Sequence, residues 1–309
     1  MYKGRTITVI IPALNEAPAI SKVVDDLFSL RVCPQCDLPA GDLEVGDKQI
    51  AENQSDEMLI GDEPKHKSPP AAKADGALRC GHDACQNTNN HTAMERLVDQ
   101  IIVCDNGSTD DTAALAASCG AIVTHEPEQG YGAACLAALD VPVEKDVVVF
   151  VDGDGSVVAT ELPGLIDPLY SGADLVIGSR TLGSTERGAL TIPQQFGNQL
   201  ASFLIRTLWS SDVTDLGPFR ATTQATLTDL KMTDRQFGWT VEMQVRALQQ
   251  HKVVIEVPVS TRRRVGVSKI SGTLRGVIGA ANGILGSIFK LYWAGLGKRT
   301  LPIRIASRN

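Results

Sequence analysis

The chain has 309 residues, 43% of them hydrophobic, so it can bury a sizeable core and is not a disordered polypeptide. Seven cysteines are too few for a disulfide-rich scaffold and favour a reducing compartment; because no secretory signal is evident, we expect a cytoplasmic protein. The net charge of −7 is uneven, since residues 33–91 carry 11 acidic and 5 basic side chains, whereas ten Lys and Arg and no acidic residue follow from Arg262 onward.

The first predicted elements are a strand and a helix. Thr6–Pro12 is a short β-branched run typical of a buried strand, and Asn15–Leu30 carries apolar residues at helical spacing. Residues 33–92 break this pattern with a polar, acidic, proline-containing segment, which indicates a loop-rich insertion.

Regular patterning resumes after the insertion with strands that alternate with helices. Such an order predicts an α/β fold with a mostly parallel central sheet flanked by helices. The predicted strands are Val98–Cys104, Ala121–Thr124, Asp146–Val151 and Asp174–Ile177, and the helices are Ala133–Leu139 and one that ends at Cys119 after a capping box of Ser108 and Asp111.

Polar side chains follow three of these strands, at the edge where parallel sheets bind ligands. Asp152 and Asp154 come directly after the most apolar strand, with one glycine between them. Two such carboxylates can hold Mg²⁺ or Mn²⁺ together with substrate phosphates, although an ordinary Asp-Gly turn would give the same pattern. The Gly130-Tyr-Gly132 segment does not form G-x-G-x-x-G after the first strand, which disfavours a dinucleotide-binding fold.

Four segments in this order and spacing resemble glycosyltransferase family 2, which has the GT-A fold. The resemblance implies a GT-A domain over residues 1–275, interrupted by the 33–92 insertion, and a separate C-terminal part over 276–309. The matching segments are Ile10–Glu16 (IIPALNE), Val103–Asp110 (VCDNGSTD), Gln129–Ala133 (QGYGA) and Val151–Asp154 (VDGD).

The later part of the chain resembles the dolichol-phosphate mannose synthase branch of that family. Asp215–Arg220 (DLGPFR) is similar to its D-x-x-S-G-F-R segment, with Gly-Pro in place of Ser-Gly. Gly238–Glu242 is similar to its aromatic-x-x-E segment, and Arg263–Lys269 to its R-x-x-G-x-S-K phosphate-binding loop. The branch therefore implies transfer of one hexose from a UDP- or GDP-linked donor, with inversion, to polyprenyl phosphate.

The resemblance also implies a role for each matching residue. Pro12, Asn15 and Glu16 are expected in the nucleoside pocket, and Asp105 at the base or ribose. Asp152 and Asp154 are expected to hold the metal and diphosphate. The remaining expected ligands are Gly130 at the nucleotide and Arg263, Ser268 and Lys269 at the phosphate, with Arg220 either joining them or pairing with Asp215.

The nature of the acceptor decides whether a catalytic base is needed. A hydroxyl acceptor must lose a proton as it attacks, whereas a phosphate monoester is already an anion and needs cations to hold it. The basic C-terminal stretch favours the phosphate. For a soluble hydroxyl acceptor, Asp215 is the predicted base, with Glu242 second.

Gly276–Leu296 is a nearly uncharged, glycine-striped stretch followed by Lys298 and Arg299. Two interpretations remain open: a helix at the membrane surface, which would make the protein peripheral, or a core helix of the domain.

Two cysteine pairs bracket the insertion and predict a structural zinc site. Cys33 and Cys36 form a C-x-x-C pair, and Cys80 and Cys85, with His82, could complete four ligands; unliganded thiols are the alternative.

Two other functions fit the sequence less well. A sugar-1-phosphate nucleotidyltransferase would need a glycine- and arginine-rich loop where PALNE stands, and a non-catalytic interaction module would not need Asp152 and Asp154. No motif predicts nucleic-acid binding. The sequence leaves the sugar, the nucleotide and the oligomeric state open.

Overall fold

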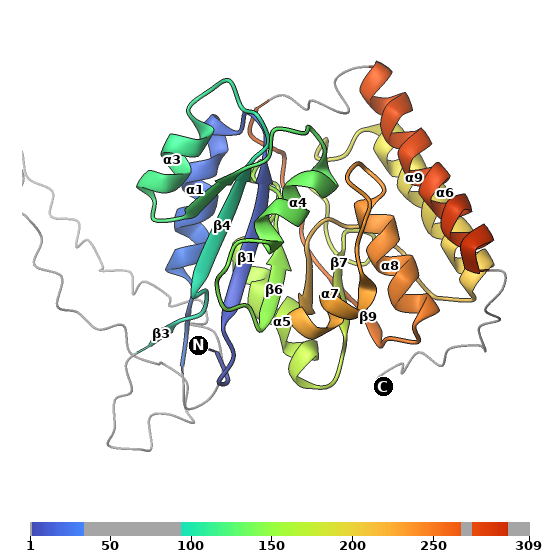
Figure 1. Ribbon diagram of the computed structural model, residues 1–309, viewed down its shortest axis with the longest axis horizontal. Coiled ribbons are helices and arrows are strands. Elements are labelled where there is room, and N and C mark those ends of the chain that lie inside the picture. Colours follow the sequence, from blue (N-terminus) through green and yellow to red (C-terminus); the bar gives the residue numbers. More distant parts are fainter. Residues whose placement is uncertain (1, 34–93, 267–273, 296–309) are drawn as a thin grey trace, which may run out of the picture. The chain divides into compact units, whose positions relative to one another are not determined.

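The computed structural model describes residues 2–33, 94–266 and 274–295 (Figure 1). The chain divides into a large unit, Met1–Leu30 with Arg96–Asn309, and a small one, Arg31–Glu95. Two short strands, β2 (Arg31–Val32) and β3 (Glu95–Arg96), pair with each other at the ends of the small unit. The insertion predicted over 33–92 therefore lies almost wholly outside the described residues.

A seven-stranded sheet with the order β5-β4-β1-β6-β8-β7-β9 forms the centre of the large unit. All its pairings are parallel except those of β8, which runs antiparallel to both β6 and β7. The mostly parallel sheet is confirmed. The strands are β1 (Ile7–Ala13), β4 (Gln100–Asp105), β5 (Ile122–His125), β6 (Val147–Phe150), β7 (Leu175–Ser179), β8 (Arg220–Thr223) and β9 (Val254–Pro258).

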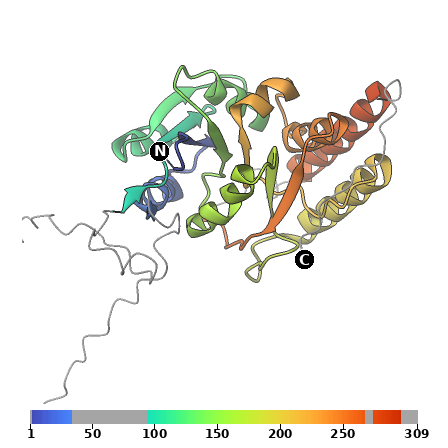
Figure 2. The ribbon, with the colours of Figure 1, turned by 90° about the horizontal axis from the view of Figure 1, so that it is seen from below.

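One face of the sheet packs against α4 (Tyr131–Leu139), α7 (Gln224–Leu230) and α8 (Trp239–Gln249). Trp239 and Phe150 meet edge to face there, with ring centroids 6.0 Å apart. Alternate strand residues point to the other face, because side chains alternate along a strand. Figure 2 shows α1 (Ala17–Ser29) and α5 (Leu162–Tyr170) on that second face.

A second cluster lies beside the sheet, where α6 (Ile192–Trp209), α8 and α9 (Leu274–Gly295) pack together (Figures 1 and 2). Ile205 and Ile288 are fully buried in it, and the Trp209 and Tyr292 rings lie 6.0 Å apart. The predicted C-terminal helix is therefore packed on the domain by one face. None of the described helices combines the length and hydropathy needed to cross a bilayer.

The helix after β4 begins differently from its prediction. α3 (Thr112–Ser118) has Asp111 as N-cap, but neither half of the expected capping box is formed. The side chain of Asp110 instead accepts hydrogen bonds from the backbone and hydroxyl of Thr112, and the Ser108 hydroxyl accepts from Asn15. The Asp110 carboxylate also accepts from the Ala17 backbone at 3.3 Å, so Ser108 and Asp110 join the loop after β4 to the loop after β1.

Candidate active site

The loop after β1 is held against the loop after β4. Asn15 has a left-handed backbone (φ +52°), which Asn tolerates better than most residues. Its side-chain oxygen accepts from the Thr109 backbone at 2.6 Å, and its N–H donates to the Ser108 hydroxyl at 2.8 Å. Glu16 donates its N–H to the Thr112 hydroxyl. Pro12 lies in β1 opposite Cys104. The structure thus brings the expected nucleoside-pocket residues together.

Asp105 ends β4 and is almost buried, with 7% of its surface exposed. Its carboxylate accepts from the Ser108 backbone at 3.2 Å and lies 3.3 Å from Nδ1 of the exposed His125. The carboxylate is therefore fixed at the sheet edge, and its contact with base or ribose stays a prediction.

Gly130 allows the segment before α4 to pack closely against the backbone of residues 234–236. A side chain there would place Cβ 2.1 Å from the Arg235 carbonyl oxygen. The N–H groups of Gly132 and Ala133, at the start of α4, donate to the carbonyls of Gln236 and Arg235, and the Gly130 N–H donates to Asn106. These donors are occupied, so this geometry does not support Gly130 as a nucleotide ligand.

Asp152 and Asp154 follow β6 directly and form the acidic centre of the site. Oδ1 of Asp154 accepts from the Ser156 backbone at 2.9 Å, and its Oδ2 lies 3.5 Å from Nη1 of Arg264. Burial, reinforced by the charge of Asp154, raises the pKa of Asp152 to about 7, and Arg180 and Arg264 oppose that rise. A carboxylate whose ionisation is opposed by burial and by a neighbouring carboxylate fits a divalent cation, which would supply the missing positive charge.

The described residues supply only part of a coordination shell. No group of three or more His, Cys, Asp or Glu side chains is arranged around a single metal position within 2–33, 94–266 and 274–295. Mg²⁺ and Mn²⁺ are commonly held by one or two carboxylates with phosphates and water. The donor set therefore fits a metal that binds together with a diphosphate.

Asp215 is fully buried and pairs with Arg180, which directly follows β7. Arg180 donates to Oδ1 at 2.6 Å through Nη2 and to Oδ2 at 2.9 Å through Nε, and its backbone N–H donates to Oδ2 at 2.7 Å. Both oxygens are engaged, so action as a base would require Arg180 to move away.

Glu242 and Arg220 have structural contacts that their sequence motifs do not reveal. Burial favours a raised pKa for Glu242, but hydrogen bonds from Thr233 and Asp234, with Arg246, hold the pKa below its ordinary value. Arg220 is fully buried and donates to three backbone carbonyls, those of Leu216, Gly217 and Thr240. Arg220 was expected at a phosphate or on Asp215; that expectation is wrong, because burial turns its donors inward.

The arginine-rich segment, Arg262–Arg264, runs beside the acidic loop, which is the stretch 152–156 that follows β6. Arg262 donates its N–H to the Ser156 carbonyl, and Val265 donates to the Asp154 carbonyl, both at 2.9 Å. Arg263 is exposed; its backbone N–H donates to Glu186 and its Nε to the Arg187 carbonyl. Ser268 and Lys269, the other expected phosphate ligands, lie outside the described residues.

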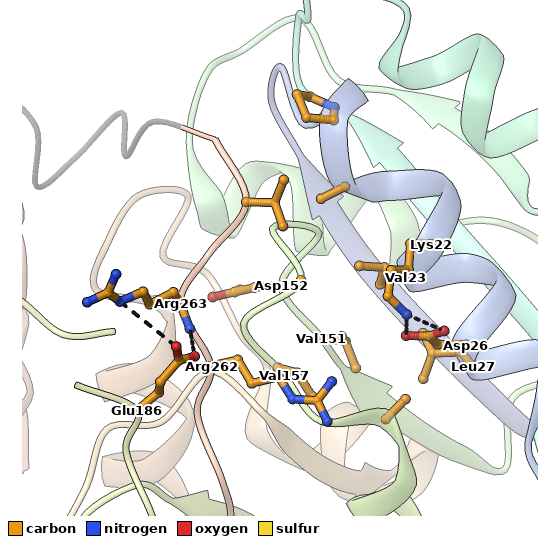
Figure 3. A pocket seen from close by; sticks show the side chains of 15 residues that line it. Lys22, Val23, Asp26, Leu27, Val151, Asp152, Val157, Glu186, Arg262 and Arg263 are labelled. Atoms are coloured by element: carbon orange, nitrogen blue, oxygen red, sulfur yellow. Dashed lines mark hydrogen bonds and ion pairs between the residues drawn. The ribbon is translucent and has the colours of Figure 1, made fainter. Parts of the chain in front are cut away.

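A cavity of about 320 Å³ lies between α1 and this segment (Figure 3). The Lys22–Asp26 ion pair stands on one side of it, and the Arg263–Glu186 contact on the other (Figure 3). Most of its lining is aliphatic. The aliphatic lining residues are Pro18, Ala19, Val23, Leu27, Val151, Val157, Ala159 and Val265.

Two arginines at the site were not singled out from the sequence. Arg180 could have been found, since it follows a predicted strand as Asp152 does. Arg264 could not, because the run Arg262–Arg264 signals a cation cluster without showing which member turns inward. The predicted zinc ligands Cys36, Cys80, His82 and Cys85 lie outside the described residues, whereas Cys33 is buried.

Comparison with known proteins fits this geometry. The model of the family "Glycosyl transferase family 2" matches residues 77–229. An uncharacterized glycosyltransferase of Mycobacterium tuberculosis is 40% identical over 180 residues, which are 57% of this chain and 80% of that protein. The polyprenol monophosphomannose synthase of Mycolicibacterium smegmatis is 33% identical over 190 residues, 56% of this chain and 71% of that protein.

A solved structure shows the same fold. Glucosyl-3-phosphoglycerate synthase from Mycobacterium tuberculosis, in complex with Mn²⁺, uridine diphosphate and phosphoglyceric acid, superposes with a TM-score of 0.59 at 20% identity, over 94% of this chain and 79% of that one. The order of the strands, the two carboxylates after β6 and the sequence relatives all indicate the same family. The chain belongs to glycosyl transferase family 2, has its GT-A fold, and is a glycosyltransferase.

Proposed function

We propose that this enzyme transfers one hexose, with inversion, from a UDP- or GDP-linked sugar to polyprenyl phosphate. The observation that carries the proposal is the hydrogen-bonded contact between the arginine-rich segment and the Asp152–Ser156 loop. It sets cations beside the carboxylates proposed to hold the donor's metal. Relatives named polyprenol monophosphomannose synthase and undecaprenyl-phosphate mannosyltransferase, 33% and 28% identical, support this acceptor class.

Asp152 and Asp154 would hold Mg²⁺ or Mn²⁺, which would neutralise the diphosphate and help it leave. Asn15, Glu16 and Asp105, fixed at the ends of β1 and β4, would orient the nucleoside. Arg263, with Ser268 and Lys269, would hold the acceptor phosphate close to a negatively charged donor. Each residue thus binds or orients a reactant.

The geometry favours an acceptor that needs no base. The carboxylates of Asp215 and Glu242 are buried and already hydrogen-bonded, whereas a phosphate oxygen attacks without losing a proton. The aliphatic cavity beside Arg262 and Arg263 could take the first isoprene units of the acceptor. The aliphatic lining therefore suits an apolar chain, and Arg262 and Arg263 at its edge are the side chains that could meet a phosphate.

A peripheral membrane contact belongs to the same proposal. α9 exposes Phe289 and Trp293, and α6 exposes Ile192, Phe196 and Phe203 on the side opposite its buried Ile205. Neither helix contains an acidic residue. Aromatic and aliphatic side chains with no carboxylate among them suit an anionic lipid surface, where a polyprenyl acceptor would reside.

The test is transfer of a radiolabelled sugar to a short-chain polyprenyl phosphate, run beside soluble hydroxyl acceptors. We expect product on the lipid phosphate only, in a reaction that requires Mn²⁺ or Mg²⁺. Efficient transfer to a soluble hydroxyl, with none to the lipid, would contradict the proposal and make Asp215 the base to examine.

A further inference from the structure

Three charged side chains from distant parts of the sequence meet at the acidic loop. Nη2 of Arg264 donates to Oε1 of Glu16 at 3.0 Å, and its Nη1 lies 3.5 Å from Oδ2 of Asp154. Glu16 and Asp154 are each 9% exposed. Because carboxylates so far from solvent need a counter-charge, the guanidinium stabilises both in the structure described here.

The two oxygens of Asp154 are not equivalent. Oδ1 accepts from the Ser156 backbone within the turn, whereas Oδ2 faces Arg264. A divalent cation held by Asp152 and Asp154 would meet the guanidinium on the Oδ2 side of Asp154. Arg264 and the cation would therefore compete for this carboxylate.

The hydrogen bonding of Arg264 indicates that its guanidinium can take a second position. Nε of Arg264 is buried and has no hydrogen-bond acceptor among the described residues, a costly state for a charged donor. The next residue, Val265, donates its N–H to the Asp154 carbonyl, which fixes the backbone beside the site. A change of side-chain position alone would let the guanidinium leave Asp154 and meet an anion.

We propose that Arg264 is a resident counter-ion of the metal-free enzyme, which the divalent cation displaces from Asp154 when the nucleotide diphosphate binds. The inference rests on the metal site of the proposed function, but not on the acceptor. Glu16 keeps the displaced guanidinium near the site, where the diphosphate supplies the anion that its donors lack. Arg264 is thus a positioning residue that couples binding of the metal to binding of the nucleotide.

Binding of Mn²⁺ alone, measured by calorimetry or by the electron paramagnetic resonance signal of free Mn²⁺, tests the competition. Removing the competing charge in Arg264→Gln should tighten Mn²⁺ binding by on the order of tenfold or more. Arg264→Lys keeps the charge and should bind Mn²⁺ within about threefold of wild type. Arg206→Gln removes an exposed arginine from α6 and is the matched control, with unchanged binding expected.

A second titration, with saturating UDP or GDP present, tests the coupling. The nucleotide should tighten Mn²⁺ binding more in the wild type than in Arg264→Gln, because only the wild type has a guanidinium to transfer to the diphosphate. If the wild type and both Arg264 variants bind Mn²⁺ with equal affinity in the absence of nucleotide, the counter-ion role of Arg264 is wrong. That result would leave the proposed function untouched. If Arg264→Gln does not fold, Arg264→Lys becomes the deciding variant. An Mn²⁺ affinity of Arg264→Lys that differs from wild type by more than about threefold then contradicts the counter-ion role.

The outcomes separate this inference from the proposed function. A wild-type enzyme that binds no Mn²⁺ or Mg²⁺, with or without nucleotide, would remove the metal site and the counter-ion role together. Transfer to an acceptor other than polyprenyl phosphate would contradict the proposed function and leave the counter-ion role standing.

Discussion

Asp152 and Asp154 are the side chains on which the proposed chemistry depends most directly. Asp152→Asn and Asp154→Asn should each lower metal-dependent turnover by on the order of 100-fold or more, about 3 kcal/mol of barrier, because one ligand charge is lost. Circular dichroism and melting should show that both variants fold. Turnover within about threefold of wild type would contradict the metal assignment.

The raised pKa of Asp152 gives a second, pH-dependent expectation. The folded state holds this proton more tightly than the unfolded chain, because the carboxyl is buried beside Asp154. Between the ordinary carboxyl pKa of 3.8 and about 7, ionisation of Asp152 therefore lowers the stability of the folded state as the pH rises. In metal-free protein, Asp152→Asn should raise Tm relative to wild type at about pH 8, and the gain should shrink toward about pH 5.

Added Mn²⁺ is the control for that experiment. It should stabilise the wild type at the higher pH and leave Asp152→Asn nearly unchanged, because only the wild type retains the full ligand pair. A difference in Tm that does not vary with pH would show that the effect is not the ionisation of Asp152.

The exposed Arg263 should bind a reactant. Removal of one charged phosphate ligand costs about 2–3 kcal/mol, so Arg263→Ala should weaken transfer roughly 30- to 150-fold. Binding of the nucleotide-sugar, followed by thermal shift, should change less. An equal loss of donor binding would place Arg263 at the donor instead.

Single residues divide into those that the sequence can assign and those that it cannot. Asn15 and Asp152 come after strands and Asp105 ends one, and because the strand ends of a parallel sheet meet at one edge, their position at that edge was predictable. The contacts of Gly130 and Glu242 were not predictable, because Gly130 packs against the carbonyl of Arg235, about a hundred residues away, and the Glu242 carboxylate accepts hydrogen bonds from the Thr233 and Asp234 backbone N–H groups across a turn.

At the scale of elements, α6 is the feature with the clearest consequence. Its outward stripe of Ile192, Phe196 and Phe203 lies opposite the packed face of the same helix. Replacing Phe196 and Phe203 together by Ser should reduce flotation with anionic vesicles at least about fivefold and leave metal binding intact. Ile122→Ser, on the edge strand β5, is the matched control.

Size-exclusion chromatography with light scattering separates lipid from protein contacts on that face. We expect the same mass for wild type and the double variant. A shift from dimer to monomer, without a change in flotation, would show that α6 contacts a second copy of the chain and not the membrane.

The elements themselves were predicted well in the first half of the chain and poorly in the second. Strands β1, β4 and β6 are continuous apolar runs, which is how buried parallel strands read in a sequence. β8 reads Arg-Ala-Thr-Thr and is polar by composition, so nothing in its own residues marks it as a central, antiparallel strand. Its burial comes from pairing with β6 and β7, which is a tertiary effect.

For the whole chain, the predicted zinc site of Cys33, Cys36, Cys80 and Cys85 or His82 stays a prediction. Elemental analysis of tag-free protein, purified without chelator, should give close to one zinc per chain. Cys36→Ser should lower that ratio and leave Mn²⁺-dependent transfer intact, because the Asp152–Asp154 site is chemically separate. An absence of zinc in both proteins would reject the site.

The strand order also has a consequence for biosynthesis. β5, β4, β1 and β6 come from residues up to Phe150, and β8, β7 and β9 from residues after Asp174, so the sheet is two blocks joined where β6 meets β8. A ribosome-bound chain can emerge as far as the end of the first block, with the loops that follow β1 and β4, before the second block has been synthesised. The ion pair of Arg264 with Glu16 joins the segment that follows β9, the last strand, to the loop that follows β1, the first strand, so the Glu16 carboxylate gains this counter-charge only when synthesis has passed both blocks.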